Sequence, residues 1–402
     1  MTNKITVVDA RMGRGKTSAA IRYMNDHKGE RRFLYITPYL TEVRRVCDLC
    51  EFIEPDDETS SKLAKLKQLM RLGRNIASTH ALFDLLDAEA LTLAEESGYS
   101  LIMDESPELV SHLPTSKQDT EYILRELADI AEDNRVIWRD DGYKGVWGGY
   151  KELASKGRLY NVGEAFYRVT DPHCFRVFRE VFLLTYLFDG QLIRAYLDCF
   201  GFTYEIIGVR QDDIGYCFSD APDAPPPVDL SRLIRFVEKP RMNRVGEGKN
   251  ALSVSWYSRR HRGDAEIKAL RNNLRTFFER MITSEGGEHL WTTYVDRKHW
   301  LLGQRGRFST GFLALNARAT NAYRDATAVA YLVNRFVDPN IAKFFASRGV
   351  RIDADQFALA EMLQFIWRSA IRDGKEIDLY IPSRRMRELL KGWMKSVNGG
   401  VM

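Results

Sequence analysis

A run of small and basic residues between an apolar segment and a helical stretch has the composition of a phosphate-binding loop. Gly13 and Gly15 allow backbone N–H groups to turn toward phosphate oxygens. Lys16 would place a positive charge on the β- and γ-phosphates, and Thr17 would offer Mg²⁺ a hydroxyl ligand. We therefore expect an ATP and Mg²⁺ site whose binding residues are Ala10, Gly13, Arg14, Gly15, Lys16, Thr17 and Ser18.

Two carboxylates follow a second apolar segment. Leu101 to Met103 leads directly into Asp104 and Glu105. Asp104 would hold Mg²⁺ through water, and Glu105 would orient and deprotonate the attacking water. An acidic pair at the end of a strand can also be plain surface, but its pairing with the phosphate loop favours a hydrolytic site.

These side chains need rigid elements to hold them, and the hydrophobic pattern supplies two series of strands and helices. Strands alternating with helices predict an α/β fold with mainly parallel sheets. The first series has strands at Lys4–Asp9, Phe33–Thr37, Ile76–Thr79 and Leu101–Met103. The second has strands at Ser253–Trp256, Leu290–Tyr294, Gly311–Leu315, Thr327–Leu332 and Ile377–Ile381, with helices at Asp264–Met281, Asp355–Ala370 and Ser383–Lys395.

Composition places the chain among soluble globular proteins. Among its 402 residues, 59 Lys and Arg against 55 Asp and Glu leave a net charge of +4, which excludes a globally basic tail. No apolar run approaches the roughly 18 residues that span a bilayer, so we expect a cytoplasmic protein without membrane contacts. Five cysteines indicate reduced thiols, and Cys47 and Cys50 are interpreted as free thiols rather than a metal or redox pair.

The two site motifs resemble motifs I and II of the superfamily 2 helicases, where Ala10 is a common variant of the first glycine. Further segments follow in that family's order. They are Thr37-Pro38 (motif Ia), Ser78-Thr79-His80 (Ib), Leu184-Thr185-Tyr186 (III), Asn316–Asn334 with Thr320 and Asn321 (V), and Gln364–Arg372 (VI). The resemblance covers nearly the whole chain. It extends to compact helicases encoded by tailed bacteriophages, on Gln364–Gly374 and Leu379–Ser383.

The resemblance implies two RecA-like domains that clasp ATP in the cleft between them, with nucleic acid lying across both. It places the first domain at residues 1–190, a connector with a proline-rich loop at 191–250, and the second domain at 251–402. By motif position, it assigns backbone contacts with nucleic acid to Thr37, Pro38, Ser78, Thr79, Thr320 and Asn321.

Motif VI departs from the family pattern. Trp367 stands where the family has glycine, and Arg372 falls one residue later than the family's second arginine. Gln364, Arg368 and Arg372 recur every four residues, so we expect them on one face of a helix. We assign Gln364, Arg368 and Arg372 to catalysis, with Arg372 as the arginine finger on the γ-phosphate.

Basic clusters are candidates for a nucleic-acid track, although a single cluster of this kind is more often a solvated surface. The dense run at 259–262 includes Arg259 and Arg260, while Arg241 and Arg244 follow the proline-rich loop and Arg305 and Arg307 flank a glycine. Phosphate contacts require only basic and small polar groups, so the sequence does not select among these clusters.

The leading hypothesis is an ATP-dependent helicase or translocase for phage replication or recombination. Single-stranded or tailed DNA is the preferred partner, RNA stays open, and replication proteins are possible partners. One alternative is a nucleotide-gated binding, loading or remodelling ATPase that does not separate strands. Another is a terminase-type packaging ATPase, for which residues 310–402 show no obvious carboxylate cluster of a nuclease.

Overall fold

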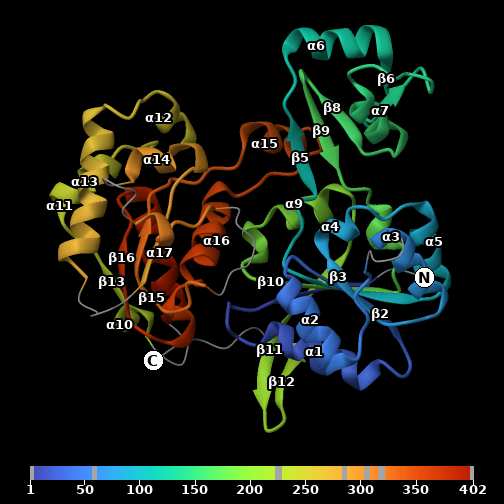
Figure 1. Ribbon diagram of the computed structural model, residues 1–402, viewed down its shortest axis with the longest axis horizontal. Helices are drawn as coiled ribbons and strands as arrows, with labels where there is room; N and C mark the ends of the chain where they lie inside the picture. Colours follow the sequence, from blue (N-terminus) through green and yellow to red (C-terminus); the bar gives the residue numbers. More distant parts are fainter. Residues whose placement is uncertain are drawn as a thin grey trace. The chain divides into compact units, whose positions relative to one another are not determined.

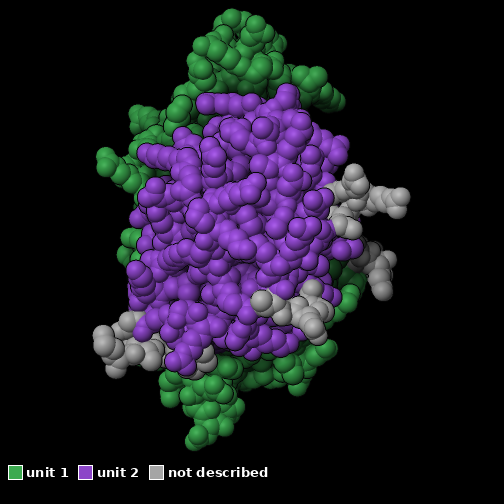
Figure 2. Space-filling model, turned by 90° about the vertical axis from the view of Figure 1, so that its left-hand side faces the viewer, with its two compact units in different colours: residues 1–10, 15–222, 337–352 green, residues 11–14, 223–336, 353–402 purple. Residues whose placement is uncertain are grey.

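A computed structural model describes residues 4–56, 61–221, 229–282, 288–302, 308–315 and 322–398 of the chain. These residues form two compact units (Figure 2). The first unit comprises residues 1–10, 15–222 and 337–352, and the second comprises residues 11–14, 223–336 and 353–402. The proline-rich stretch at 222–228, Arg305, Arg307, Thr320 and Asn321 lie outside the described residues.

The first unit is built on a seven-stranded sheet with the strand order β12-β11-β1-β10-β4-β2-β3 (Figure 1). All neighbouring pairs are parallel except β11 and β12, which form an antiparallel hairpin. The strands are β1 (Lys4–Asp9), β2 (Arg32–Thr37), β3 (Ile76–Thr79), β4 (Tyr99–Asp104), β10 (Glu180–Thr185), β11 (Tyr204–Asp212) and β12 (Gly215–Ser219).

Apolar side chains cover both faces of this sheet, as expected for parallel strands buried between helices. Alternate residues of one strand belong to different core clusters. Leu34 and Ile36 pack in one cluster, and Phe33 and Tyr35 pack in the other. The surrounding helices include α1 (Lys16–His27), α2 (Leu40–Cys50), α3 (Lys62–Arg71), α4 (His80–Phe83), α5 (Ala88–Glu96), α8 (His173–Arg176) and α9 (Leu192–Cys199).

A small subdomain that the sequence analysis did not anticipate is inserted between β4 and β10 (Figure 1). It carries a three-stranded sheet, β5-β9-β8, and a two-stranded sheet, β6-β7. Its elements are β5 (Val110–Leu113), α6 (Lys117–Tyr122), a π-helix (Ile123–Leu127), β6 (Ala128–Ile130), β7 (Val136–Trp138), α7 (Gly148–Ser155), β8 (Leu159–Val162) and β9 (Ala165–Val169).

Helix α15 (Pro339–Ala346) belongs to the first unit, although its neighbours in sequence belong to the second. The ring of Phe344 is fully buried against Tyr160 of β8 and Tyr167 of β9, with centroid distances of 6.0 and 5.3 Å. The Arg348 guanidinium lies over the Phe344 ring at 4.1 Å and donates to the Asp133 carbonyl. This segment therefore anchors a late part of the chain in the core of the first unit.

The second unit has a four-stranded parallel sheet with the order β13-β16-β15-β14. Its strands are β13 (Ile234–Phe236), β14 (Glu288–Thr292), β15 (Ala326–Tyr331) and β16 (Ile377–Tyr380). Its helices include α10 (Leu230–Leu233), α11 (Pro240–Asn243), α12 (Val254–Ser258), α13 (Ala265–Arg280), α14 (Lys298–Leu301), α16 (Ala354–Ile366) and α17 (Arg384–Asn398). The α/β class with two RecA-like domains is thus confirmed.

Three expectations about the second series were wrong. Ser253–Trp256 opens helix α12 instead of forming a strand, because the Ser253 hydroxyl accepts the Trp256 N–H and caps a helix there. Gly311–Leu315 is not a strand either, and only Phe312 makes a single bridge to Trp291. The helix expected to reach Ala370 ends at Ile366. Among the described residues, no helix is long and apolar enough to cross a membrane.

We predict that Phe344→Ala lowers the free energy of unfolding by about 3–5 kcal/mol, because it leaves a cavity between three packed rings. Lys343→Ala on the exposed side of the same helix is the matched control and should leave stability unchanged. Urea denaturation followed by circular dichroism measures both. Equal stability of the two variants would show that α15 is not part of this core.

Candidate nucleotide and nucleic-acid sites

The predicted phosphate loop connects the end of β1 to the start of α1. Gly13 and Gly15 have left-handed backbones, with φ of 79° and 76°, and Gly15 is the N-cap of α1. The first N–H groups of a helix have no partner within it, so this end of α1 favours an anion. The Lys16 ammonium donates a hydrogen bond to the Ala10 carbonyl, which keeps it on the loop.

Strand register brings the second motif to the same edge of the sheet. Val8 of β1 lies opposite Leu184 of β10, and Leu184 lies opposite Asp104 of β4. The Thr17 hydroxyl donates to Asp104 Oδ2 at 2.7 Å. A hydroxyl and a carboxylate in contact are oxygen ligands of the kind that Mg²⁺ takes in nucleotide sites, so the residues present fit that ion.

Tyr35 of β2 is a member of the site that the sequence did not reveal. Its hydroxyl is buried and donates to the same Asp104 oxygen at 2.9 Å. Burial, and next to it the charge of Asp104, hold the pKa of Tyr35 well above its usual value. The phenol therefore stays protonated and fixes the orientation of the carboxylate. No pattern in β2 distinguishes this tyrosine from an ordinary core aromatic residue.

Glu105 has a strained backbone at the position where the general base is expected. Its φ is 63°, in the left-handed region that side chains other than glycine rarely adopt. Its N–H donates to the Leu184 carbonyl, and its exposed carboxylate accepts the Tyr39 hydroxyl at 2.7 Å. These two bonds hold both the backbone and the carboxylate of Glu105.

A hydrogen-bonded chain connects the second motif to the segment assigned to motif III. The Ser106 hydroxyl donates to Gln191 Oε1 at 2.9 Å, and Gln191 Nε2 donates to the Tyr186 carbonyl at 2.7 Å. At the phosphate loop, Arg45 of α2 donates to the Ser18 hydroxyl. Asp9, just before the loop, accepts the Phe188 N–H, and burial raises the pKa of its carboxyl group.

The residues expected to contact nucleic acid in the first unit lie at the ends of two adjacent strands. Thr37 ends β2 and Thr79 ends β3, and the two are register partners. Thr37 and Ser78 are buried, whereas Pro38 and Thr79 are half-buried. Of these four residues, Pro38 and Thr79 are the ones that a nucleic-acid backbone could reach without rearrangement.

Motif VI is not one continuous helix, so the expected single face is wrong. Gln364 lies in the last turn of α16, which ends at Ile366. The backbone is extended at Ser369, whose hydroxyl donates to the Ile366 carbonyl, and a 3₁₀ turn follows at Ala370–Asp373. Arg368 therefore lies in the break and Arg372 in the 3₁₀ turn, which removes the shared helical register with Gln364.

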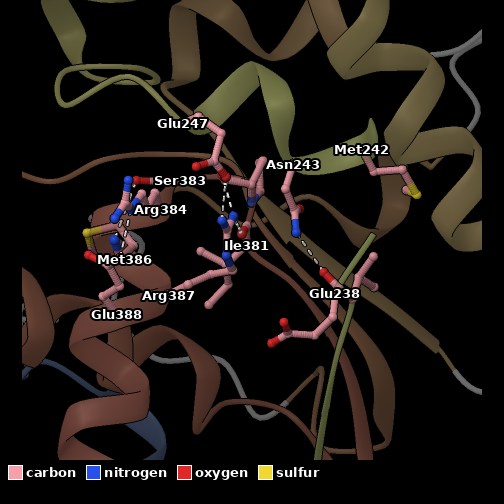
Figure 3. Close-up of polar contacts among 12 residues, drawn as sticks. Glu238, Met242, Asn243, Glu247, Ile381, Ser383, Arg384, Met386, Arg387 and Glu388 are labelled. Atoms are coloured by element: carbon pink, nitrogen blue, oxygen red, sulfur yellow. Dashed lines mark hydrogen bonds and ion pairs between the residues drawn. The ribbon is translucent and has the colours of Figure 1, made fainter. Parts of the chain in front are cut away.

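A second candidate site lies in the second unit, where β13 and β16 end. A cavity of about 680 Å³ there is lined by Glu238, Pro240, Arg241, Asn243, Arg244, Glu247 and Arg387. Figure 3 shows Arg387 between Glu247 and the backbone near Ile381. The Arg387 guanidinium donates hydrogen bonds to the Glu247 carboxylate and to the Ile381 carbonyl. Next to Glu247, the backbone of Gly246 packs closely on Pro382, because a Cβ at Gly246 would lie 2.0 Å from the Pro382 carbonyl oxygen.

Arginines of the second unit differ in whether they are paired with an acidic side chain. Glu238 pairs with Lys391 and Glu247 with Arg387, while Arg241 and Arg244 have no acidic partner among the described residues. By contrast, Arg260 is held by two hydrogen bonds to Glu266 and stacks on Trp256 at 3.8 Å. Arg259 is exposed.

Comparisons with known proteins agree with this architecture. Residues 228–394 match the family described as the YonV C-terminal Rossmann-like domain. The chain is 35% identical to the SPbeta prophage-derived uncharacterized protein YonV of Bacillus subtilis (strain 168), over 98% of this chain and 99% of that protein. Two solved structures share the fold. XPD_APO has a TM-score of 0.51 at 10% identity, with 96% of this chain and 95% of that chain covered. XPD_Helicase has a TM-score of 0.50 at 9% identity, with 99% and 95% covered.

We predict that Glu105→Gly raises the free energy of unfolding by about 1 kcal/mol relative to Glu105→Gln. Glycine adopts a positive φ without the steric cost that any other side chain carries. Glutamine retains both the strain and the ability to bond with Tyr39, so it is the matched comparison. Parallel urea titrations measure the difference. If Glu105→Gly proved no more stable than Glu105→Gln, the argument for strain at this position would be removed.

Proposed function

The chain belongs to the family of the prophage protein YonV, and from this premise we propose that it is a phage-type, ATP-dependent nucleic-acid helicase or translocase. We further propose that it acts on DNA in the host cytoplasm, during phage replication or recombination. The fold shared with the XPD structures supports an enzyme of this class, since XPD_Helicase is itself named a helicase. Single-stranded or tailed DNA is the proposed substrate, and RNA is the alternative partner.

The observation that carries this proposal is the contact between Thr17 and Asp104. Their oxygens are 2.7 Å apart, although 87 positions separate the residues in sequence. An exposed acidic pair unrelated to the loop would not be expected to meet the one hydroxyl that a phosphate loop offers to a metal ion. This contact, together with the left-handed Gly13 and Gly15, supports ATP and Mg²⁺ as ligands.

In the proposed mechanism, the site residues of the first unit have separate roles. Lys16 leaves the Ala10 carbonyl and neutralises the β- and γ-phosphates. Thr17, and Asp104 through water, would hold Mg²⁺, which would neutralise charge on the phosphate oxygens. Glu105 accepts a proton from the attacking water, and Tyr39 keeps its carboxylate oriented until then.

The second unit is proposed to contribute Gln364, Arg368 and Arg372 during turnover, with Arg372 as the arginine finger. An arginine supplied in this way stabilises charge that develops only in the transition state. The domain limits expected from the sequence, 1–190, 191–250 and 251–402, stay part of this proposal. A nucleotide-gated loader without strand separation is the alternative function, and a packaging ATPase is a further one.

We predict that the protein hydrolyses ATP and that single-stranded DNA stimulates the rate. Lys16→Ala should lower kcat/KM for ATP by roughly 10²-fold or more, because the phosphates lose their point countercharge. Glu105→Gln should bind ATP but not turn it over, because the metal ligands remain while the base is lost. Steady-state kinetics with and without single-stranded DNA measure these effects.

Unwinding assays on tailed DNA and RNA duplexes of both polarities separate the alternatives. Turnover without strand separation would favour the loader or remodelling function. A Lys16→Ala protein with the parental rate of hydrolysis would remove the ATPase proposal itself.

Arg241 and Arg244 are the proposed phosphate contacts of the second unit, since they line the cavity and carry unopposed charge. Replacing both with alanine should weaken binding to single-stranded DNA. The slope of log K against log salt should fall by about 1.4, at roughly 0.7 per lost phosphate contact. Lys268→Ala with Arg280→Ala, two exposed residues of α13, removes the same charge elsewhere in this unit. Equal slopes for the two double variants would assign Arg241 and Arg244 to plain surface.

A further inference from the structure

An aromatic ring fills the space that a side chain would occupy at Gly15. A Cβ built on Gly15 would lie 2.3, 2.4 and 2.5 Å from three ring carbons of Tyr216. These distances are shorter than any real Cβ contact, so the ring rests directly on the glycine. Tyr216 comes from β12, about two hundred residues later in the chain, and the sequence analysis assigned it no role.

The hairpin that carries Tyr216 is fastened to the helix that follows the phosphate loop. Asp212, at the end of β11, accepts two hydrogen bonds from Arg22 of α1, at 2.8 and 2.9 Å. Phe218 of β12 lies 5.5 Å from the ring of Tyr23 in α1 and stacks on Phe182 of β10. Helix α1 therefore has contacts with the hairpin at Gly15, Arg22 and Tyr23.

The hairpin is also continuous with the strand that leads into the loop. Strand β11 pairs in parallel with β1 over Ile5–Val8, so both ends of the phosphate loop are attached to the same element. The β11–β12 hairpin lies beside α1 (Figure 1), so the strand that carries Tyr216 is held next to the start of that helix.

We propose that Tyr216 is a positioning residue that keeps the phosphate loop in its anion-binding shape. The expected effect of Tyr216 on nucleotide binding rests on the proposed function. Its effect on the shape of the loop does not. Gly15 is the N-cap of α1 and holds φ at 76°, a conformation that glycine can leave easily. The ring blocks the side from which Gly15 could relax, so the amides at the start of α1 stay turned toward the phosphates.

The aromatic ring, and not the hydroxyl group, performs this role. The Tyr216 hydroxyl makes no hydrogen bond to another described residue, and the contact with Gly15 is made by ring carbons. Phenylalanine at this position should therefore preserve the loop, whereas alanine should release it. Such rescue by the conservative variant separates a steric role from one in proton transfer or polar recognition.

Amide hydrogen exchange tests the structural part of the proposal in the absence of nucleotide. The Ala19 N–H donates to the Gly15 carbonyl at 2.8 Å, so its exchange rate reports whether Gly15 stays in place. Tyr216→Ala should raise the exchange rate of the Ala19 amide at least tenfold, and Tyr216→Phe should not. Ile214→Ala is the matched control, because it removes an exposed apolar side chain at the tip of the same hairpin without touching the loop or α1.

Equilibrium binding of a fluorescent ATP analogue tests the functional part. Tyr216→Ala should raise Kd for the analogue by roughly tenfold or more, since misplaced phosphate donors lose much of their effect. Tyr216→Phe and Ile214→Ala should stay within about twofold of the parent. Competition with ATP and GTP should show the same preference in all variants, because the ring acts on the loop and not on the base.

The outcomes separate this inference from the proposed function. Unchanged Ala19 exchange in Tyr216→Ala, or an equal rise in Ile214→Ala, would overturn the positioning role. A changed preference between ATP and GTP would also overturn it, since Tyr216 would then read the base. If the parent protein bound no nucleotide, the proposed function would fail, and the exchange measurements would still decide the positioning role.

Discussion

The hydrogen bond from Thr17 to Asp104 depends on one geometric constraint, the shared register of three parallel strands. Val8, Leu184 and Asp104 lie side by side in β1, β10 and β4. Parallel strands in register end at one edge, so whatever follows each strand is delivered to the same place. The phosphate loop follows β1, Glu105 follows β4, and the Leu184-Thr185-Tyr186 segment closes β10. A shift of one residue in β4 would turn Asp104 to the opposite face and separate it from Thr17.

Aromatic side chains hold this edge in place, and each acts through a different atom. Tyr35 fixes Asp104 through its hydroxyl, and Tyr39 fixes Glu105 in the same way. Tyr216 acts on Gly15 through its ring. Two of the residues with positive φ in the loop and the acidic pair, Glu105 and Gly15, thus have a tyrosine against them, while Gly13 is the third. At Glu105 such support is expected, because a positive φ costs a residue other than glycine about 1–3 kcal/mol and persists only where the surroundings determine it. At Gly15 the conformation carries no such cost, and the ring limits the freedom of the glycine instead.

The sequence alone identifies the site residues that form an unusual pattern. It does not identify site residues of a type that is common in any core. A glycine-rich loop before a helix and an acidic pair after an apolar strand are rare combinations, so the loop and Asp104-Glu105 stood out. Tyr35 and Tyr216 did not, because a tyrosine in a strand usually has no role beyond packing. Their importance lies in contacts across strands that are distant in sequence, and a single sequence does not report such contacts.

Local hydrogen bonds of serine side chains account for two of the errors in secondary structure. Ser253 starts a helix in a segment rich in strand-forming residues, because its hydroxyl satisfies the N–H of Trp256. Ser369 ends the regular backbone within motif VI, because its hydroxyl bonds to the Ile366 carbonyl. In both places one serine outweighs the propensity of its neighbours, and the periodicity of the neighbours predicts the wrong element.

The path of the chain also limits how the two units can be separated. Residues 337–352 lie within the sequence of the second unit, yet Ile341, Phe344 and Phe345 are buried in the core of the first. The family match at 228–394 includes this stretch, so a fragment with those limits would expose three large apolar side chains to water. The inserted subdomain would in turn lose the helix that covers Tyr160 and Tyr167. The two RecA-like domains therefore have separate sheets, but the core of the first unit includes a segment that lies within the sequence of the second.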